Sequence, residues 1–118
     1  MSKKNTRSAI NSIQGGGPPL AAAFTEAGDA AAPANLSVTF NSGLGHMEAR
    51  LFRGGPLVDQ GSLDQSGDIP FASVQSGDMI SINGICSGTT VVTIAVPTDP
   101  ATPISFPQGN FHHLFMVN

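Results

Sequence analysis

The sequence contains no tryptophan and no tyrosine, and its 7 aromatic residues are all phenylalanine. Proteins that bind sugars usually stack the sugar ring on an exposed Trp or Tyr, whose face is apolar and whose edge carries a polar group. That absence counts against a lectin-like protein, but polar loops rich in Asn, Asp, Gln and Gly keep a small carbohydrate- or ligand-binding module as the alternative function. Strand patterning predicts that most of the phenylalanines are core residues, namely Phe40, Phe52, Phe71, Phe111 and Phe115.

Cysteine and charge are also scarce. The single cysteine, Cys86, excludes a disulfide within the chain, and we expect it to be a small buried hydrophobic residue. Only 11% of the residues are charged, against roughly 25% in ordinary soluble domains. A freely diffusing monomer relies on surface charge for solubility, so this composition favours a surface that other copies of the chain partly cover.

Long apolar runs are missing as well. No stretch approaches the ~18 apolar residues that span a bilayer, so we expect no membrane insertion. The basic residues near the N-terminus are not followed by the apolar segment of a signal peptide, because the next apolar run, Leu20 to Phe24, is too short. We therefore expect a protein that is cytoplasmic as synthesised.

The charges that are present are unevenly placed. Lys3, Lys4 and Arg7 are three of the 5 basic residues, whereas the chain after Arg7 holds 2 Arg against 8 Asp and Glu, a net charge of 2 − 8 = −6. An acidic body repels phosphate, and three cations neutralise too few phosphates for useful affinity. Nucleic-acid binding is therefore not expected.

Residues 1–34 read as an N-terminal arm and residues 35–118 as one domain. The arm contains a glycine triplet at 15–17, then Pro18 and Pro19, then an alanine-rich stretch. Glycines supply a hinge and prolines an extended spacer, so the arm is expected to be flexible unless it docks on a partner surface.

From Leu36 onward apolar and polar residues alternate, as half-buried strands require. Pro70 cannot donate a ladder hydrogen bond, so its strand is expected to begin there or to lie at a sheet edge. Residues 59–68 are predicted to be a polar loop and the prolines at 97, 100, 103 and 107 an irregular crossing. About seven short strands predict an all-β fold, a single two-sheet β-sandwich of immunoglobulin-like or jelly-roll type.

The segment Phe71 to Ile82, FASVQSGDMISI, has an aromatic residue, then V-x-x-G-D-x-I-x-I. It resembles the strand-turn-strand element of transthyretin-like and related sandwich modules. The resemblance covers about 12 of the 118 residues. It implies a sandwich fold and no particular function.

No pattern predicts catalysis or a metal site, so we expect neither an enzyme nor a cofactor. His112 and His113 are neighbours in a predicted strand and point to opposite faces, and His46 adds no cysteine or carboxylate in ligand spacing. Asp59, Asp64 and Asp68 lack the spacing of a calcium loop, and turn capping explains them. No G-x-S-x-G motif occurs.

The last predicted strand has two apolar faces. Phe111, His113, Phe115 and Val117 share one face, whereas His112, Leu114 and Met116 share the other. A sandwich buries only one face of each sheet, so the second face is expected to be an interface, or to be covered by the chain's own arm or loops. We therefore predict a structural protein that self-assembles into a filament, tube or coat, with other copies of itself as partners. The expected self-association residues are Lys3, Lys4, Arg7, Ile10, Ile13, Leu20, Phe24, His112, Leu114 and Met116.

Overall fold

A computed structural model describes residues 30–118, which form β-strands and no helix. The strands are β1 (Ala32–Asn41), β2 (Gly45–Phe52), β3 (Leu57–Leu63), β4 (Gly67–Val74), β5 (Met79–Cys86), β6 (Thr89–Ile94), β7 (Thr98–Asp99), β8 (Ile104–Phe106) and β9 (Gly109–Val117). This part of the chain offers no helix of the length and hydropathy that a membrane crossing demands.

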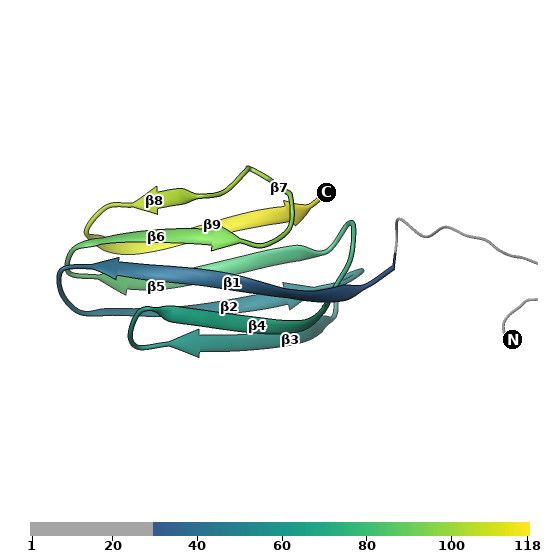
Figure 1. Cartoon of the computed structure of the whole chain (residues 1–118), viewed down its shortest axis with the longest axis horizontal. Helices are drawn as coiled ribbons and strands as arrows, with labels where there is room; N and C mark the ends of the chain where they lie inside the picture. The colour runs from purple at the N-terminus through teal and green to yellow at the C-terminus, as the bar shows by residue number, and fades with distance from the viewer. Residues whose placement is uncertain (1–29) are drawn as a thin grey trace, which may run out of the picture. The chain divides into compact units, whose positions relative to one another are not determined.

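The strands form two antiparallel sheets that pack face to face (Figure 1). One sheet has the order β4-β1-β6-β8 and the other β3-β2-β5-β9-β7. The predicted fold class, an all-β two-sheet sandwich, is confirmed. The described residues hold nine strands rather than about seven, because the proline-rich stretch contributes two short ones, β7 and β8.

β1 lies in the interior of its sheet because both of its edges are paired. It pairs with β4 from Ala32 to Val38 and with β6 from Leu36 to Asn41. Its first residues belong to the stretch that the sequence assigned to the arm, and Ala34 is already buried. The chain therefore enters the sandwich at Ala32.

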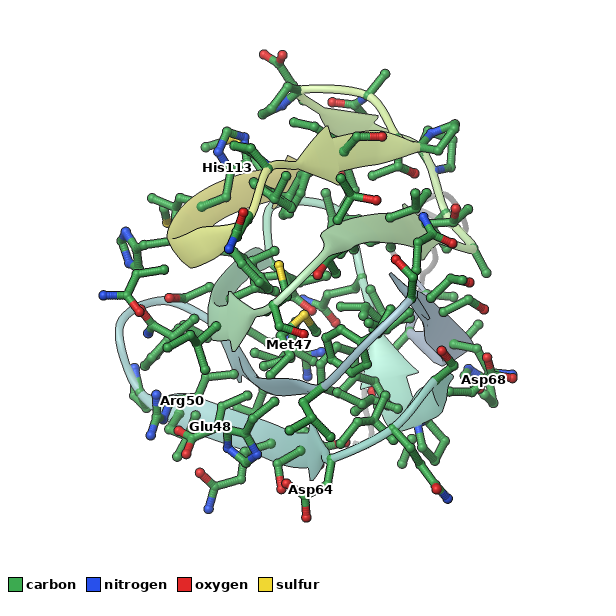
Figure 2. All side chains as sticks on the ribbon, turned by 90° about the vertical axis from the view of Figure 1, so that its left-hand side faces the viewer. Met47, Glu48, Arg50, Asp64, Asp68 and His113 are labelled. Atoms are coloured by element: carbon green, nitrogen blue, oxygen red, sulfur yellow. The ribbon has the colours of Figure 1, made fainter. Side chains whose placement is uncertain are left out.

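The core follows from the alternation in the sequence. In β2, Met47, Ala49 and Leu51 point inward, and in β5 Ile80 and Ile82 do the same. Figure 2 shows Met47 inside the molecule, with Glu48 and Arg50 of the same strand on its outside. The full set of buried apolar side chains is Ala34, Leu36, Val38, Met47, Ala49, Leu51, Ile69, Phe71, Val74, Ile80, Ile82, Cys86, Val92, Ile94, Phe106, Phe111, Phe115 and Val117.

The predicted polar loop at 59–68 is wrong over most of its length. β3 continues to Leu63 and β4 begins at Gly67, so the connection is a short turn. Asp59 lies within β3, where its carboxylate accepts hydrogen bonds from the backbone N–H of Gln60 and of Ala72 in β4. Pairing with β2 makes this polar segment a strand, and an edge strand needs few apolar residues. The expectation for Pro70 is confirmed, because β4 is an edge strand.

Candidate functional site

The last strand, β9, places the predicted contact residues as the alternation requires. His112 is exposed, Leu114 is 46% exposed and Met116 is 50% exposed, all on the outer face of the five-stranded sheet. Phe111 and Phe115 point into the core. The other expected self-association residues, Lys3, Lys4, Arg7, Ile10, Ile13, Leu20 and Phe24, lie outside the described residues.

An apolar row crosses the outer face of this sheet. Leu57 of β3 pairs with Phe52 of β2 at an irregularity, where the register shifts after Leu51; Phe52 lies opposite Met79 of β5, and Met79 opposite Met116 of β9. Residues directly opposite in regular antiparallel strands have Cβ atoms ~5 Å apart, so Phe52, Met79 and Met116 are neighbours, and Leu57 lies beside Phe52 at the register shift. Leu114 lies two residues from Met116 on the same face. We call Leu57, Phe52, Met79, Met116 and Leu114 the apolar row.

From the sequence we did not predict that three members of the apolar row lie on this outer face. Phe52 was predicted to be a core residue, but it is only half-buried and points outward, since Leu51 beside it takes the inward position. Leu57, at 46% exposure, and Met79 were given no role. A signal was present: Met79 precedes the inward Ile80, so its position had to face out. The sequence did not show that four strands bring these residues into one line.

The apolar row lies at the end of the sandwich where β1 begins. Ala32 pairs with Val74, the last residue of β4, and the following turn leads directly to Met79. Figure 1 shows the start of β1 at the same end as the C-terminus of β9. The polypeptide that precedes β1 is therefore joined to the domain near the row.

An ion pair between a partly exposed arginine and a buried carboxylate fixes this end. Asp78 is 1% exposed, and its carboxylate accepts hydrogen bonds from Arg53 Nε at 2.9 Å, Arg53 Nη2 at 2.8 Å and the Gln75 N–H at 2.9 Å. Arg53 also donates to the carbonyl of Ser73. The hydrogen bonds from the guanidinium lower the pKa of Asp78 and raise that of Arg53. The pair ties the end of β2 to the turn before β5.

A polar cluster occupies the middle of the same outer face. His46 Nδ1 lies 2.5 Å from Asp64 Oδ1, and its Nε2 lies 3.6 Å from Glu48, which also pairs with Arg50 at 3.0 Å. The hydrogen bond to Asp64, with Glu48 beside it, raises the pKa of His46 above its ordinary value. Figure 2 shows Glu48, Arg50 and Asp64 at the surface. The groups are solvent-exposed, so the cluster contributes little to stability.

Two shallow hollows flank the cluster. One, of about 310 Å³, lies over β2 and β3 and is lined by Glu48, Ala49, Arg50, Gln60, Gly61 and Ser62. The other, of about 410 Å³, lies at the opposite end from the apolar row, beside the exposed Leu44 and Ile85. Cys86 adjoins it, but the thiol is buried and donates to the carbonyl of Gly88 at 3.0 Å.

The histidines of β9 point in opposite directions. His113 packs among phenylalanine rings, 5.7 Å from the centroid of Phe106 and 4.9 Å from that of Phe115. Its Nε2 is buried without a hydrogen-bond partner among the described residues, as is Thr90 Oγ1. Within residues 30–118 no three His, Cys, Asp or Glu side chains gather as metal ligands would.

Comparison with known proteins adds no relative. No protein-family model matches the chain, and neither a curated protein nor a solved structure is significantly similar to it. The sequence and the chemistry of the described surface therefore carry the functional argument.

Proposed function

We propose that this protein is a structural subunit that self-associates through the outer face of its five-stranded sheet and through its N-terminal arm. The apolar row is the observation that carries the proposal. It places large apolar side chains from four strands side by side on an outer surface, where they are partly exposed to water and do not stabilise a monomer. Scarce charge over the whole chain supports the same conclusion.

The energy available from the row indicates that it does not act alone. Leu57, Leu114 and Met116 are each about half exposed, so covering one of them stabilises a complex by ~1 kcal/mol. Two copies that cover each other's row gain roughly 6 kcal/mol on this basis. Loss of translational and rotational freedom costs about 4–15 kcal/mol. A stable assembly therefore needs a second contact.

The arm supplies that contact in our proposal. Its cations Lys3, Lys4 and Arg7 oppose the acidic domain, and its apolar residues Ile10, Ile13, Leu20 and Phe24 provide anchors. Fully extended, the 29 residues before Ala30 span up to ~100 Å, enough to reach another subunit. A contact from the arm of one copy to the domain of the next is heterologous, and such contacts build rings or filaments.

Charge inserted into the row tests the proposal. Leu114→Lys and Met116→Lys each place a cation where we expect a dry contact, so subunits should dissociate while the far-UV circular dichroism of the β-sandwich is unchanged. The mass is measured by size-exclusion chromatography with light scattering, and particles are viewed by negative-stain microscopy. Thr93→Lys adds the same charge to the exposed outer face of the other sheet and serves as the control.

Two outcomes count against self-association. One is an unchanged particle size in both row variants. The other is a wild-type chain that stays monomeric at high concentration. Deletion of residues 1–29 should weaken assembly as well, and raised salt should weaken it only partly, because screening acts on the cations and not on the apolar anchors. The deletion stops before Ala32 because β1 begins there.

Carbohydrate binding is the second candidate function. The hollow of about 310 Å³ over β2 and β3 presents a carboxylate, a guanidinium, an amide and a hydroxyl, which together donate and accept hydrogen bonds as sugar hydroxyls require. No aromatic side chain lines this hollow. Glycan-array binding by a monodisperse monomer, lost in Gln60→Ala, would favour this candidate over self-association.

A further inference from the structure

The five-stranded sheet has an open edge along β9. On one side β9 pairs with β5 over its whole length, from Cys86 opposite Gly109 to Met79 opposite Met116. On its other side it pairs only with the two residues of β7, Thr98 and Asp99. Past Asp99 no described strand lies along β9, so residues 110–115 form the edge of this sheet.

The ladder shows which backbone groups this edge exposes. Val117 donates its N–H to Asp78 on the β5 side, and Asn118 donates to Pro97 on the β7 side. Backbone groups of successive residues in a strand point in alternate directions. The N–H and C=O of Asn110, His112 and Leu114 therefore point away from β5, with no backbone partner among the described residues.

The remaining edges of the described sandwich are covered, short or broken by proline. β3 and β4, edge strands of the two sheets, lie against each other and are joined by the hydrogen bond from the Ala72 N–H to Asp59, and β4 also carries Pro70. β8 has only three residues and lies between Pro103 and Pro107. Short strands, prolines and covering contacts are the devices by which proteins prevent unwanted strand pairing. Over residues 110–115 β9 is neither short nor broken by proline, and only the ring of Phe106 covers its inner side, so its backbone edge is the one on which an added strand could pair.

The chain itself contains a segment that fits. Leu20 to Phe24, with the sequence LAAAF, is the longest uncharged apolar run before Ala30, and its five residues are enough to cover most of the edge at residues 110–115. In an extended strand Leu20, Ala22 and Phe24 share one side, and two alanines share the other. Pro18 and Pro19 stop such a strand at its N-terminal end.

Packing beside the edge decides which side faces inward. Phe106 of β8 stacks on Phe111 of β9 with ring centroids 4.7 Å apart, and its ring lies edge-on to His113. These rings lie on the inner side of the edge, so an added strand that turns its small alanine side chains to this side avoids crowding them. In such a strand Leu20 and Phe24 would face outward, in line with Leu114 and Met116 of the apolar row.

From this geometry we propose that residues 20–24 of a second copy add as a strand to the β9 edge. The inference rests on the proposed self-association and names its second contact. A second copy is the occupant because a strand added beside Leu114 and Met116 is continuous with the apolar row, the face through which we propose that copies associate. Strand addition also explains why a short arm with few charges suffices, since backbone hydrogen bonds carry the affinity.

Hydrogen exchange of the assembled full-length protein tests this directly. Amides of Phe111, His113 and Phe115 bond to β5 and exchange slowly in any case. If a strand is added, amides of the edge that bond to it, His112 and Leu114 among them, should exchange at least about 100-fold more slowly than unprotected amides, because the added bonds open less than ~1% of the time. Exchange is quenched, the particles are dissociated, and the label is read residue by residue.

A full-length double variant separates strand addition from other contacts of the arm. Ala22→Pro with Ala23→Pro removes the N–H groups of both alternating positions, so the edge amides should exchange at least ~10-fold faster and the particle mass should fall. Ala22→Ser with Ala23→Ser keeps both N–H groups and is the matched control. It should retain both the protection and the mass.

The outcomes distinguish this inference from the proposed function. Edge amides that exchange freely in an intact assembly overturn strand addition and leave self-association standing. Protected edge amides in a monomer overturn the second copy, because the subunit's own arm then fills the edge. Free edge amides in a monomer overturn both proposals.

Discussion

The buried ion pair between Arg53 and Asp78 allows a quantitative test of what holds the end of the sandwich that carries the apolar row. Arg53→Ala removes two of the three hydrogen bonds to a carboxylate that is 1% exposed, and leaves it the Gln75 N–H alone. Removal of one partner of a buried pair costs about 3–5 kcal/mol, because the other charge stays buried and uncompensated. A domain of this size has a stability of ~4–13 kcal/mol, so the variant is close to unfolding.

The control is Arg50→Ala. Arg50 pairs with Glu48 at the surface, where the two side chains are 39% and 44% exposed. A pair of this kind contributes about 0–1 kcal/mol, so this variant should remain near wild-type stability. Both variants lose one arginine; Arg53→Ala differs in that it leaves a buried carboxylate behind and also removes the hydrogen bond to the carbonyl of Ser73. Because the chain has no Trp or Tyr, unfolding in urea is followed by far-UV circular dichroism.

The pH dependence of the free energy of unfolding tests the direction of the Asp78 pKa shift. The pKa of Asp78 is lowered in the folded wild type, so the pair's contribution is complete above the ordinary carboxyl pKa of about 4 and is lost as pH falls through the lower folded value. In Arg53→Ala burial raises the pKa of Asp78 instead, and stability falls as pH rises. The stability gap between wild type and variant should therefore shrink from pH 7 to pH 3. Equal losses in Arg53→Ala and Arg50→Ala, or a gap that does not depend on pH, would refute this reasoning.

Three further predictions concern single sites. Asp64→Asn should lower the pKa of His46, as measured by NMR titration. The pKa of His46 is raised in the folded wild type. The stability that His46 contributes is therefore present below about pH 6.5 and is lost as pH rises through the folded pKa. Gly84→Ala should cost about 1–3 kcal/mol in urea unfolding, because the new Cβ would lie 2.7 Å from the carbonyl oxygen of His46 and against the ring of Phe111. Thr90→Val should raise the stability measured in urea by about 1 kcal/mol, because its buried hydroxyl has no partner in the described part of the chain; a loss would show that the hydroxyl is bonded.

Local alternation in the sequence determined the fold class and most of the core. Side chains of a strand alternate between its two faces, so Met47, Ala49 and Leu51 predict one buried face before the neighbouring strands are known. The same rule placed His112, Leu114 and Met116 on the outer face of the last strand, as the structure has them. The same alternation predicts that Phe52 faces outward, because Leu51 beside it faces inward. We nevertheless assigned Phe52 to the core, because phenylalanine is usually a core residue.

Strand pairing was beyond the sequence because it depends on long-range register. The polar residues of β3 and the two residues of β7 form strands because they pair with β2 and β9, respectively. The ion pair between Arg53 and Asp78 joins residues 25 apart in sequence, with no local pattern to mark it. The apolar row and the open edge of β9 arise in the same way, since the register between strands decides which outward side chains become neighbours and which backbone groups are left without a partner.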